Sequence, residues 1–217
     1  MDRTSAELPR DRDRGAPFAG VVLAGGASRR MGRDKALLVG PEGTWGPEGT
    51  WLERSVARLA RAGASPIWVA GGDPSWVPEG ARHVPDGRPG QGPLAGIESA
   101  MQRSRLEGRA RGGEKVGSTW CLVVACDLPS LEGESLSRLL EARTPEVSAV
   151  AARGPGGLEP LVALYQDALL EELRAFLDSG QRSARRFLEG LGSALTQVEL
   201  PAAVLLNANT PQDLEDL

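Results

Sequence analysis

Short apolar runs alternate with longer amphipathic segments along most of this chain, and this alternation restricts its fold more than any other feature. We expect strands or extended segments at residues 18–23, 66–70, 82–85, 120–125, 147–152, 159–165, 198–200 and 204–206. We expect helices at residues 51–62, 93–103, 133–142, 167–177 and 181–191, a short helix after Pro211, and a loop over residues 105–118. The pattern is typical of an α/β protein with three layers, in which helices cover both faces of a mainly parallel, twisted sheet.

Composition indicates the broad class of the protein. Residues 1–17 are charged and interrupted by proline and glycine, so we expect a disordered extension before a single domain at residues 18–217. The formal net charge of −4 argues against a nucleic-acid binder, and no apolar run is long enough to span a membrane. With no apolar leader at the N-terminus, we expect a cytoplasmic protein. Cys121 and Cys126 should lie on opposite faces of one strand, unbonded to each other.

The sequence Gly-Pro-Glu-Gly-Thr-Trp occurs twice in succession, at residues 40–45 and 46–51. We interpret the repeat as a duplicated surface turn with no functional role. Thr50 is followed three residues later by Glu53, which predicts a capping box that starts a helix at Trp51.

A glycine-rich loop follows the first predicted strand. Gly25 and Gly26 have no Cβ, so the backbone can turn sharply and line a phosphate site with N–H groups, while Arg30 and Lys35 add positive charge. The spacing excludes a P-loop, because Gly32 is followed by arginine and not by lysine, and it excludes the G-x-G-x-x-G fingerprint. A glycine turn after a core strand, with exposed arginines, is the alternative.

An aspartate follows the most hydrophobic predicted strand. Asp127 comes directly after residues 120–126, and a carboxylate there is costly to desolvate without a partner. Mg²⁺ suits this position because it binds one or two carboxylates and completes its shell with water and phosphate oxygens. The alternative is a loop acid or helix N-cap. Since ligands bind at the carboxyl ends of parallel strands, the glycine loop and Asp127 should share one site.

The loop sequence LAGGASRRMGRDKALL resembles the L-A-G-G-x-S-x-R-M-G-x-D-K signature of the molybdenum cofactor guanylyltransferases of the MobA type, members of the nucleotidyltransferase superfamily. Further segments resemble other motifs of this family: Asp86 with Gly-Pro-Leu-Ala-Gly at 92–96, Cys-Asp-Leu-Pro at 126–129, Glu-Pro-Leu-Val-Ala-Leu-Tyr at 159–165, Gly-Gln-Arg-Ser at 180–183 and Asn-Ala-Asn-Thr-Pro at 207–211. The resemblance covers residues 18–217. It implies a Rossmann-like nucleotidyltransferase fold with a nucleotide-binding half at 18–130 and an acceptor-side half at 131–217.

The resemblance implies an enzyme that transfers GMP from GTP to the terminal phosphate of molybdopterin, or of its molybdenum form, and releases pyrophosphate. Catalysis would depend on Lys35, Arg30 and Asp127, with Asp127 as the Mg²⁺ ligand. The nucleotide would contact Leu23, Ala24, Gly25, Gly26, Ser28, Arg30, Lys35, Asp86, Gly92, Pro93, Leu94 and Asp127. The acceptor would contact Arg182, Asn207 and Asn209. Molybdoenzyme apoproteins or their chaperones are the candidate protein partners.

Several alternatives remain open at this level. Family members often carry an asparagine after the second strand, beside the guanine, whereas this chain has Ala70-Gly71-Gly72. A relative that uses CTP, or another acceptor such as a sugar phosphate, is therefore an alternative, although Ala-Gly-Gly at 24–26 favours GTP over the Ala-Ala-Gly usual in cytidylyltransferases. Asp86 would also suit a β–α turn, and Asn207 and Asn209 a turn with a helix cap. A non-catalytic nucleotide-binding protein that delivers the cofactor is the rival from another class.

Overall fold

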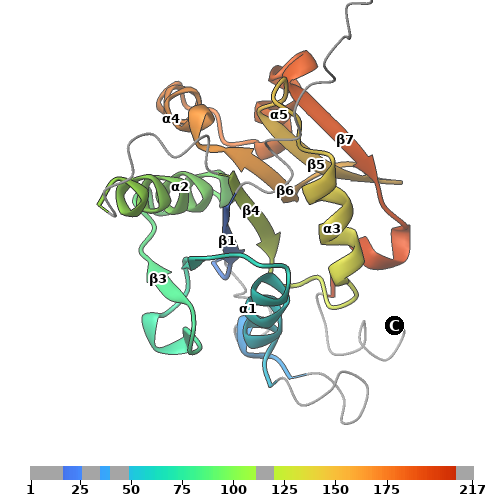
Figure 1. Cartoon of the computed structure of the whole chain (residues 1–217). Coiled ribbons are helices and arrows are strands. Elements are labelled where there is room, and N and C mark those ends of the chain that lie inside the picture. The colour runs from blue at the N-terminus through green and yellow to red at the C-terminus, as the bar shows by residue number, and fades with distance from the viewer. Residues whose placement is uncertain (1–16, 26–34, 40–48, 111–119, 209–217) are drawn as a thin grey trace, which may run out of the picture.

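The computed structural model describes residues 17–25, 35–39, 49–110 and 120–208 of the 217-residue chain. Its centre is a seven-stranded sheet with the order β3-β2-β1-β4-β6-β5-β7 (Figure 1). The strands are β1 Phe18–Leu23, β2 Ile67–Ala70, β3 Arg82–Val84, β4 Trp120–Ala125, β5 Ala149–Gly154, β6 Gly157–Gln166 and β7 Leu195–Glu199.

The sheet is mostly parallel. β1 pairs in parallel with β2 and β4, β2 pairs in parallel with β3, and β5 pairs in parallel with β7. Only the pairs that β6 makes, with β4 and β5, are antiparallel among the described strands. The predicted α/β fold is therefore confirmed. The chain builds outward from β1 to β3 and then returns to place β4 on the other side of β1, so the carboxyl ends of β1 and β4 meet at the point where ligands bind in open α/β sheets.

Helices cover both faces of the sheet (Figure 1). One face packs against α1 and α3, and the other against α2, α4 and α5. This division gives the three predicted layers. The helices are α1 Trp51–Arg61, α2 Pro93–Ala110, α3 Gly133–Glu141, α4 Leu170–Asp178 and α5 Ala184–Gly190. Within the described part of the chain, none of them combines the length and the apolar character that a membrane span requires.

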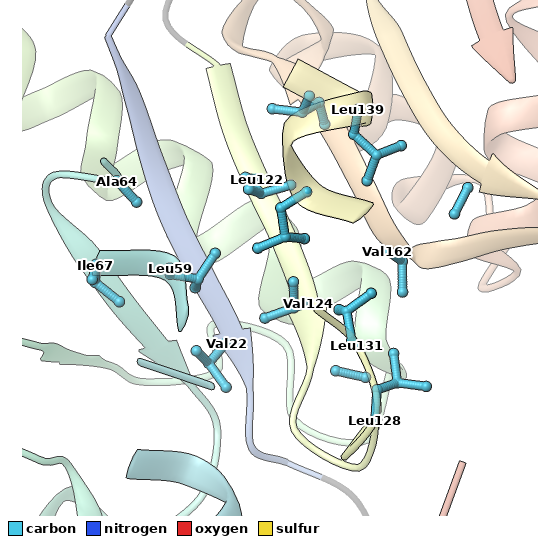
Figure 2. Packing of buried hydrophobic residues seen from close by; sticks show 14 of the residues in the cluster. Val22, Leu59, Ala64, Ile67, Leu122, Val124, Leu128, Leu131, Leu139 and Val162 are labelled. Carbon is cyan, nitrogen blue, oxygen red and sulfur yellow. The ribbon is translucent and has the colours of Figure 1, made fainter. Parts of the chain in front are cut away.

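The central strands are buried on both faces, which explains their continuous apolar sequences. All six residues of β1 and all six of β4 are buried. Figure 2 shows Val22 of β1 and Leu122 and Val124 of β4 packed with Leu59 of α1 and Leu139 of α3 on one face. The two cysteines lie in different core clusters, on opposite faces of the sheet, and both are free thiols, as predicted.

Thr50 caps α1 as predicted. Its Oγ1 accepts a hydrogen bond from the Glu53 amide at 3.3 Å, and the Glu53 carboxylate accepts one from the Thr50 amide at 2.6 Å. The reciprocal pair starts the helix at Trp51, the last residue of the second copy of the repeat.

The predicted loop over 105–118 is wrong in its first part, because α2 continues to Ala110. The glycine at 108 suggested an earlier end, but helix packing overrides such a weak local preference. Arg105, for example, pairs with Glu171 on α4 at 3.1 Å, which holds this turn of α2 against its neighbour.

The predicted strand at 204–206 is also wrong, since Ala202–Leu205 forms a 3₁₀ helix. The Leu200 amide still donates to the Arg153 carbonyl at 2.9 Å, in continuation of the β7 ladder. Pro201 comes next and has no N–H to donate, so the chain leaves the sheet there.

Some predictions fall on residues that the structure does not describe. These are the extension at 1–16, the first copy of the repeated turn at 40–45, the remainder of the predicted loop at 111–118 and the helix after Pro211.

Candidate active site

Lys35 and Asp127 meet at the carboxyl edge of the sheet. Lys35 begins a short 3₁₀ helix further along the chain from β1, and Asp127 comes two residues after β4. The Nζ atom of Lys35 lies 3.5 Å from Oδ2 of Asp127, and the two side chains are 22% and 24% exposed. The fold thus brings together two residues predicted to act in catalysis and leaves both accessible to a ligand.

The backbone of Asp127 is held from both sides. Before it, the Cys126 amide donates to the Leu23 carbonyl of β1 at 3.4 Å. The carbonyl of Asp127 itself accepts a hydrogen bond from the Ala208 amide at 3.0 Å. Ala208 is fully buried, so the C-terminal Asn-Ala segment is anchored here and the exposed Asn207 lies next to the Asp127 loop.

Two glycine turns touch beside this pair. Gly71 has φ +79°, and a Cβ at this position would lie 2.8 Å from the Cα of Gly25. Gly72 has φ +71°, and a Cβ there would lie 3.0 Å from the ring of Trp76. A side chain at Gly71 would therefore collide with backbone, one at Gly72 would crowd the Trp76 ring, and the bend after β2 packs directly against Gly25.

A cavity of about 360 Å³ opens against these turns. Five of the predicted nucleotide-binding residues line it, namely Leu23, Gly25, Asp86, Gly92 and Pro93, together with Ala70, Gly71, Gly90 and Gly96. α2 begins at Pro93, so the amide-rich end of an 18-residue helix faces the cavity and favours a negatively charged ligand.

The other predicted site residues are placed differently. Ala24 lies next to this lining, with its carbonyl 3.4 Å from the point that a Cβ on Gly72 would occupy. Leu94, in the first turn of α2, is fully buried in the core. Gly26, Ser28, Arg30 and Asn209 lie outside the described residues.

The turn that precedes α5 reaches the rim of the cavity. A Cβ at Gly92 would lie 3.9 Å from the carbonyl oxygen of Arg182. The Nη1 atom of Arg182 donates to the carbonyls of Leu177 and Gln181, each at 2.7 Å, which fixes the side chain against the end of α4. The acceptor-side segment predicted from the sequence is thus next to the nucleotide-side cavity.

A buried carboxylate holds the loop that forms one wall of the cavity. Glu98 of α2 has an 8% exposed side chain and accepts from Nε of Arg88 at 3.2 Å and from Nε of Arg174 at 3.0 Å. Arg88 also bonds Asp178, and its amide donates to Oδ1 of Asp86 at 2.9 Å. The wall is therefore tied to α2 and α4 through Arg88. Sequence analysis missed Glu98 because its partners lie on other elements.

Sequence analysis also missed Arg58, a buried arginine of α1. Its Nη1 donates to the Leu128 carbonyl at 3.3 Å and its Nη2 to the Pro129 carbonyl at 3.2 Å. Burial, with a smaller contribution from the charge of Arg54, lowers the pKa of Arg58 to about 10, so the guanidinium still carries its charge at neutral pH. An arginine in an arginine-rich amphipathic helix gives no signal in the sequence, because the carbonyls that it binds are 70 and 71 residues away.

The donor set at Asp127 limits the kind of metal that could bind. Within the described ranges, no three His, Cys, Asp or Glu side chains come together as a metal cluster. A single accessible carboxylate suits Mg²⁺, which retains water and takes substrate phosphate oxygens. Asp127 therefore fits a metal that arrives with a nucleotide.

An open α/β sheet with a glycine-lined cavity and a Lys–Asp pair at the β1–β4 switch point defines the class, that of the nucleotidyltransferases. The MobA-like NTP transferase domain matches residues 20–198, and the chain belongs to this family. The chain is 35% identical over 202 residues to a probable molybdenum cofactor guanylyltransferase from Mycobacterium avium, covering 92% of this chain and 94% of that relative. A protein described in the same way from Synechococcus elongatus is 30% identical over 212 residues, covering 92% and 97%.

Solved structures share the fold. Molybdopterin-guanine dinucleotide biosynthesis protein A from Archaeoglobus fulgidus superposes with a TM-score of 0.65 at 22% identity, covering 92% of this chain and 96% of that one. A Mycobacterium tuberculosis protein crystallised in complex with manganese gives a TM-score of 0.61 at 18% identity, covering 93% and 97%. The 2-C-methyl-D-erythritol 4-phosphate cytidylyltransferase from Thermus thermophilus gives 0.61 at 20%, covering 92% and 96%.

Proposed function

We propose that this protein is a cytoplasmic molybdenum cofactor guanylyltransferase. It transfers GMP from GTP to molybdopterin or its molybdenum form, producing the guanine dinucleotide cofactor and pyrophosphate. The observation that carries the proposal is the Lys35–Asp127 pair, 3.5 Å apart, at the sheet edge where the glycine-lined cavity opens. Membership of the MobA-like family and identities of 30–35% to probable guanylyltransferases support the choice of reaction.

The cavity is suited to the nucleoside end of GTP. Its volume of about 360 Å³ falls in the range usual for small-molecule sites, and glycine backbone forms much of its wall. The N-terminus of α2 adds partial positive charge, and Asp86 adds hydrogen-bond acceptors. The triphosphate would extend from this cavity toward Lys35, with Arg30 as a further cation.

Asp127 would hold Mg²⁺ through its carboxylate. Bound there, the ion would neutralise phosphate charge and polarise the α-phosphate. Oδ2 of Asp127 lies 3.5 Å from Nζ of Lys35, so the Lys35 ammonium and a metal ion held by Asp127 would both be placed to bind phosphate oxygens of the donor. A divalent ion is in keeping with the manganese in the crystals of the Mycobacterium tuberculosis protein of this fold.

The transfer needs no covalent enzyme intermediate. An oxygen of the molybdopterin phosphate attacks the α-phosphorus of GTP, the bond from that phosphorus to the bridging α–β oxygen breaks, and pyrophosphate leaves with the bonding electrons. The attacking phosphate is already anionic, so no strong base is required. The protein acts by positioning the two phosphates and by stabilising charge on the leaving group through Lys35 and Arg30.

The acceptor would bind on the side of residues 131–217. Arg182 lies in a turn at the rim of the cavity, and Asn207 lies beside the Asp127 loop. We assign these two residues, with Asn209, to the molybdopterin side of the site. Molybdoenzyme apoproteins or their chaperones would receive the product.

Pyrophosphate release from GTP in the presence of molybdopterin and Mg²⁺ tests the proposal. We expect release that requires all three components and that disappears in Asp127→Asn, which keeps the shape of the side chain but removes its charge. Nucleotide binding without any release would instead identify a non-catalytic carrier.

The choice of base needs a separate measurement, because this chain has Ala70-Gly71-Gly72 where the resemblance leads us to expect an asparagine beside the guanine. We expect kcat/KM for GTP to exceed that for CTP at least tenfold. The opposite order would favour a cytidylyltransferase activity on the same scaffold.

A further inference from the structure

The Cys126 amide still donates to the Leu23 carbonyl of β1, but beyond Asp127 the loop after β4 leaves the sheet, so the position of its later residues depends on other contacts. Leu128 and Leu131 anchor this loop by packing their side chains into the core (Figure 2). The Leu131 amide closes a turn by donating to the Leu128 carbonyl at 3.3 Å. In the same loop, the backbone carbonyls of Leu128 and Pro129 accept hydrogen bonds from the guanidinium of Arg58.

Arg58 is unusual for a charged residue, since only 8% of it is exposed. Taking a charge out of water is unfavourable unless hydrogen bonds compensate, and the two carbonyls provide that compensation. Both carbonyls belong to the two residues directly after Asp127. The planar fork therefore restrains the two peptide units that follow the one joining Asp127 to Leu128, and so holds the loop on the C-terminal side of Asp127.

The same helix also holds the segment that carries Lys35. At its N-terminus, the Trp51 amide donates to the Leu38 carbonyl at 2.9 Å, and Val39 forms a β-bridge with Thr50. Leu38 is three residues from Lys35. α1 is thus attached at one end to the Lys35 segment and, through Arg58, to the Asp127 loop.

We propose that Arg58 is a positioning residue for the metal and phosphate site. It fixes the Asp127 loop to α1, the helix to which the Lys35 segment is also attached. Arg58 contacts neither substrate nor metal in this proposal and acts through Asp127. The proposal rests on the assignment of Asp127 as the metal ligand. Removing a group that orients a metal ligand commonly weakens metal binding by about 10- to 100-fold.

The test compares Arg58→Met with Arg143→Met. Arg143 is a matched control because it is also a buried arginine, 3% exposed, and its Nε donates to a backbone carbonyl, that of Leu140, at 2.9 Å, away from the site. The melting temperature is measured at a fixed GTP concentration while Mn²⁺ is titrated. The reference is the melting temperature with the same GTP and a chelator, and the readout is the increase above it. Both variants should be less stable than the parent protein. Only Arg58→Met should raise the Mn²⁺ concentration for half-maximal stabilisation, by about tenfold.

Two further variants make every outcome informative. Arg58→Lys keeps the charge but loses the fork, so it should fold and show an intermediate shift in Mn²⁺ dependence, which keeps the proposal testable if Arg58→Met does not fold. Asp127→Asn should abolish the Mn²⁺ effect. If it does not, the metal assignment itself fails. Suppose instead that Asp127→Asn abolishes the Mn²⁺ effect while the folded Arg58 variants need the same Mn²⁺ concentration for half-maximal stabilisation as Arg143→Met, within twofold. That result refutes only the role of Arg58.

Discussion

Gly71→Ala tests how the two glycine turns support the nucleotide site. Gly71 has φ +79°, and its new Cβ would lie 2.8 Å from the Cα and 3.0 Å from the N of Gly25. Gly80→Ala is the matched control, because Gly80 has φ +85° with no atom within 4 Å of an added Cβ. A left-handed alanine costs about 1 kcal/mol, and forcing a methyl group into packed backbone adds about 2 kcal/mol. We therefore expect losses of about 1 kcal/mol for Gly80→Ala and about 3 kcal/mol for Gly71→Ala.

Thermal unfolding and steady-state kinetics measure the two consequences. For a chain of this size, about 3 °C is expected per kcal/mol, so Tm should fall by about 3 °C in Gly80→Ala and about 9 °C in Gly71→Ala. Because Gly25 lines the cavity, its displacement in Gly71→Ala should also raise KM for GTP about tenfold, whereas Gly80→Ala should leave KM unchanged. Equal Tm losses and equal KM values in the two variants would refute the contact between the turns as a determinant of the site.

Three other perturbations have definite expected outcomes. Lys35→Ala should lower kcat for pyrophosphate release on the order of 100-fold, or ~3 kcal/mol, because it removes the cation that we propose to face the leaving phosphates; unchanged GTP kinetics would contradict that role. Glu98→Gln should cost about 2 kcal/mol of stability and raise KM for GTP roughly fivefold, since the cavity wall loses its buried anchor. Glu107→Gln is the control: it breaks the pair that the same helix makes with Arg82 of β3, and it should leave KM as it is. Burial raises the pKa of Cys121 and Cys126 to about 12, so both thiols stay protonated at pH 8. Both should react with a disulfide reagent only after unfolding. Fast reaction of the folded protein would contradict their burial.

The local features of the site were predictable because each depends on residues close together in the sequence. The capping box at Thr50 and Glu53 requires only a spacing of three. An apolar run followed by glycines, and another followed by Asp127, indicate two strands with functional residues at their ends. Because parallel strands end at a common edge, topology predicted that the glycine loop and Asp127 share one site, and the structure adds that Lys35 lies 3.5 Å from Asp127.

Errors arose where a tertiary contact overrode a local preference, and where a local signal, the proline at 201, was not given enough weight. A glycine at 108 suggested the end of a helix, but packing of α2 on its neighbours carries the helix to Ala110. The apolar residues at 204–206 suggested a strand, but Pro201 breaks the ladder and leaves a 3₁₀ helix.

The sequence by itself therefore determined the α/β class, the alternation of elements and the residues proposed to bind phosphate and metal. Only the tertiary structure decided what holds these residues in place: Gly71 against Gly25, Glu98 between two arginines, and Arg58 on the carbonyls after Asp127. The physical reason is that these contacts join segments far apart in the chain and often involve backbone atoms, which every residue shares and which therefore leave no pattern in the sequence.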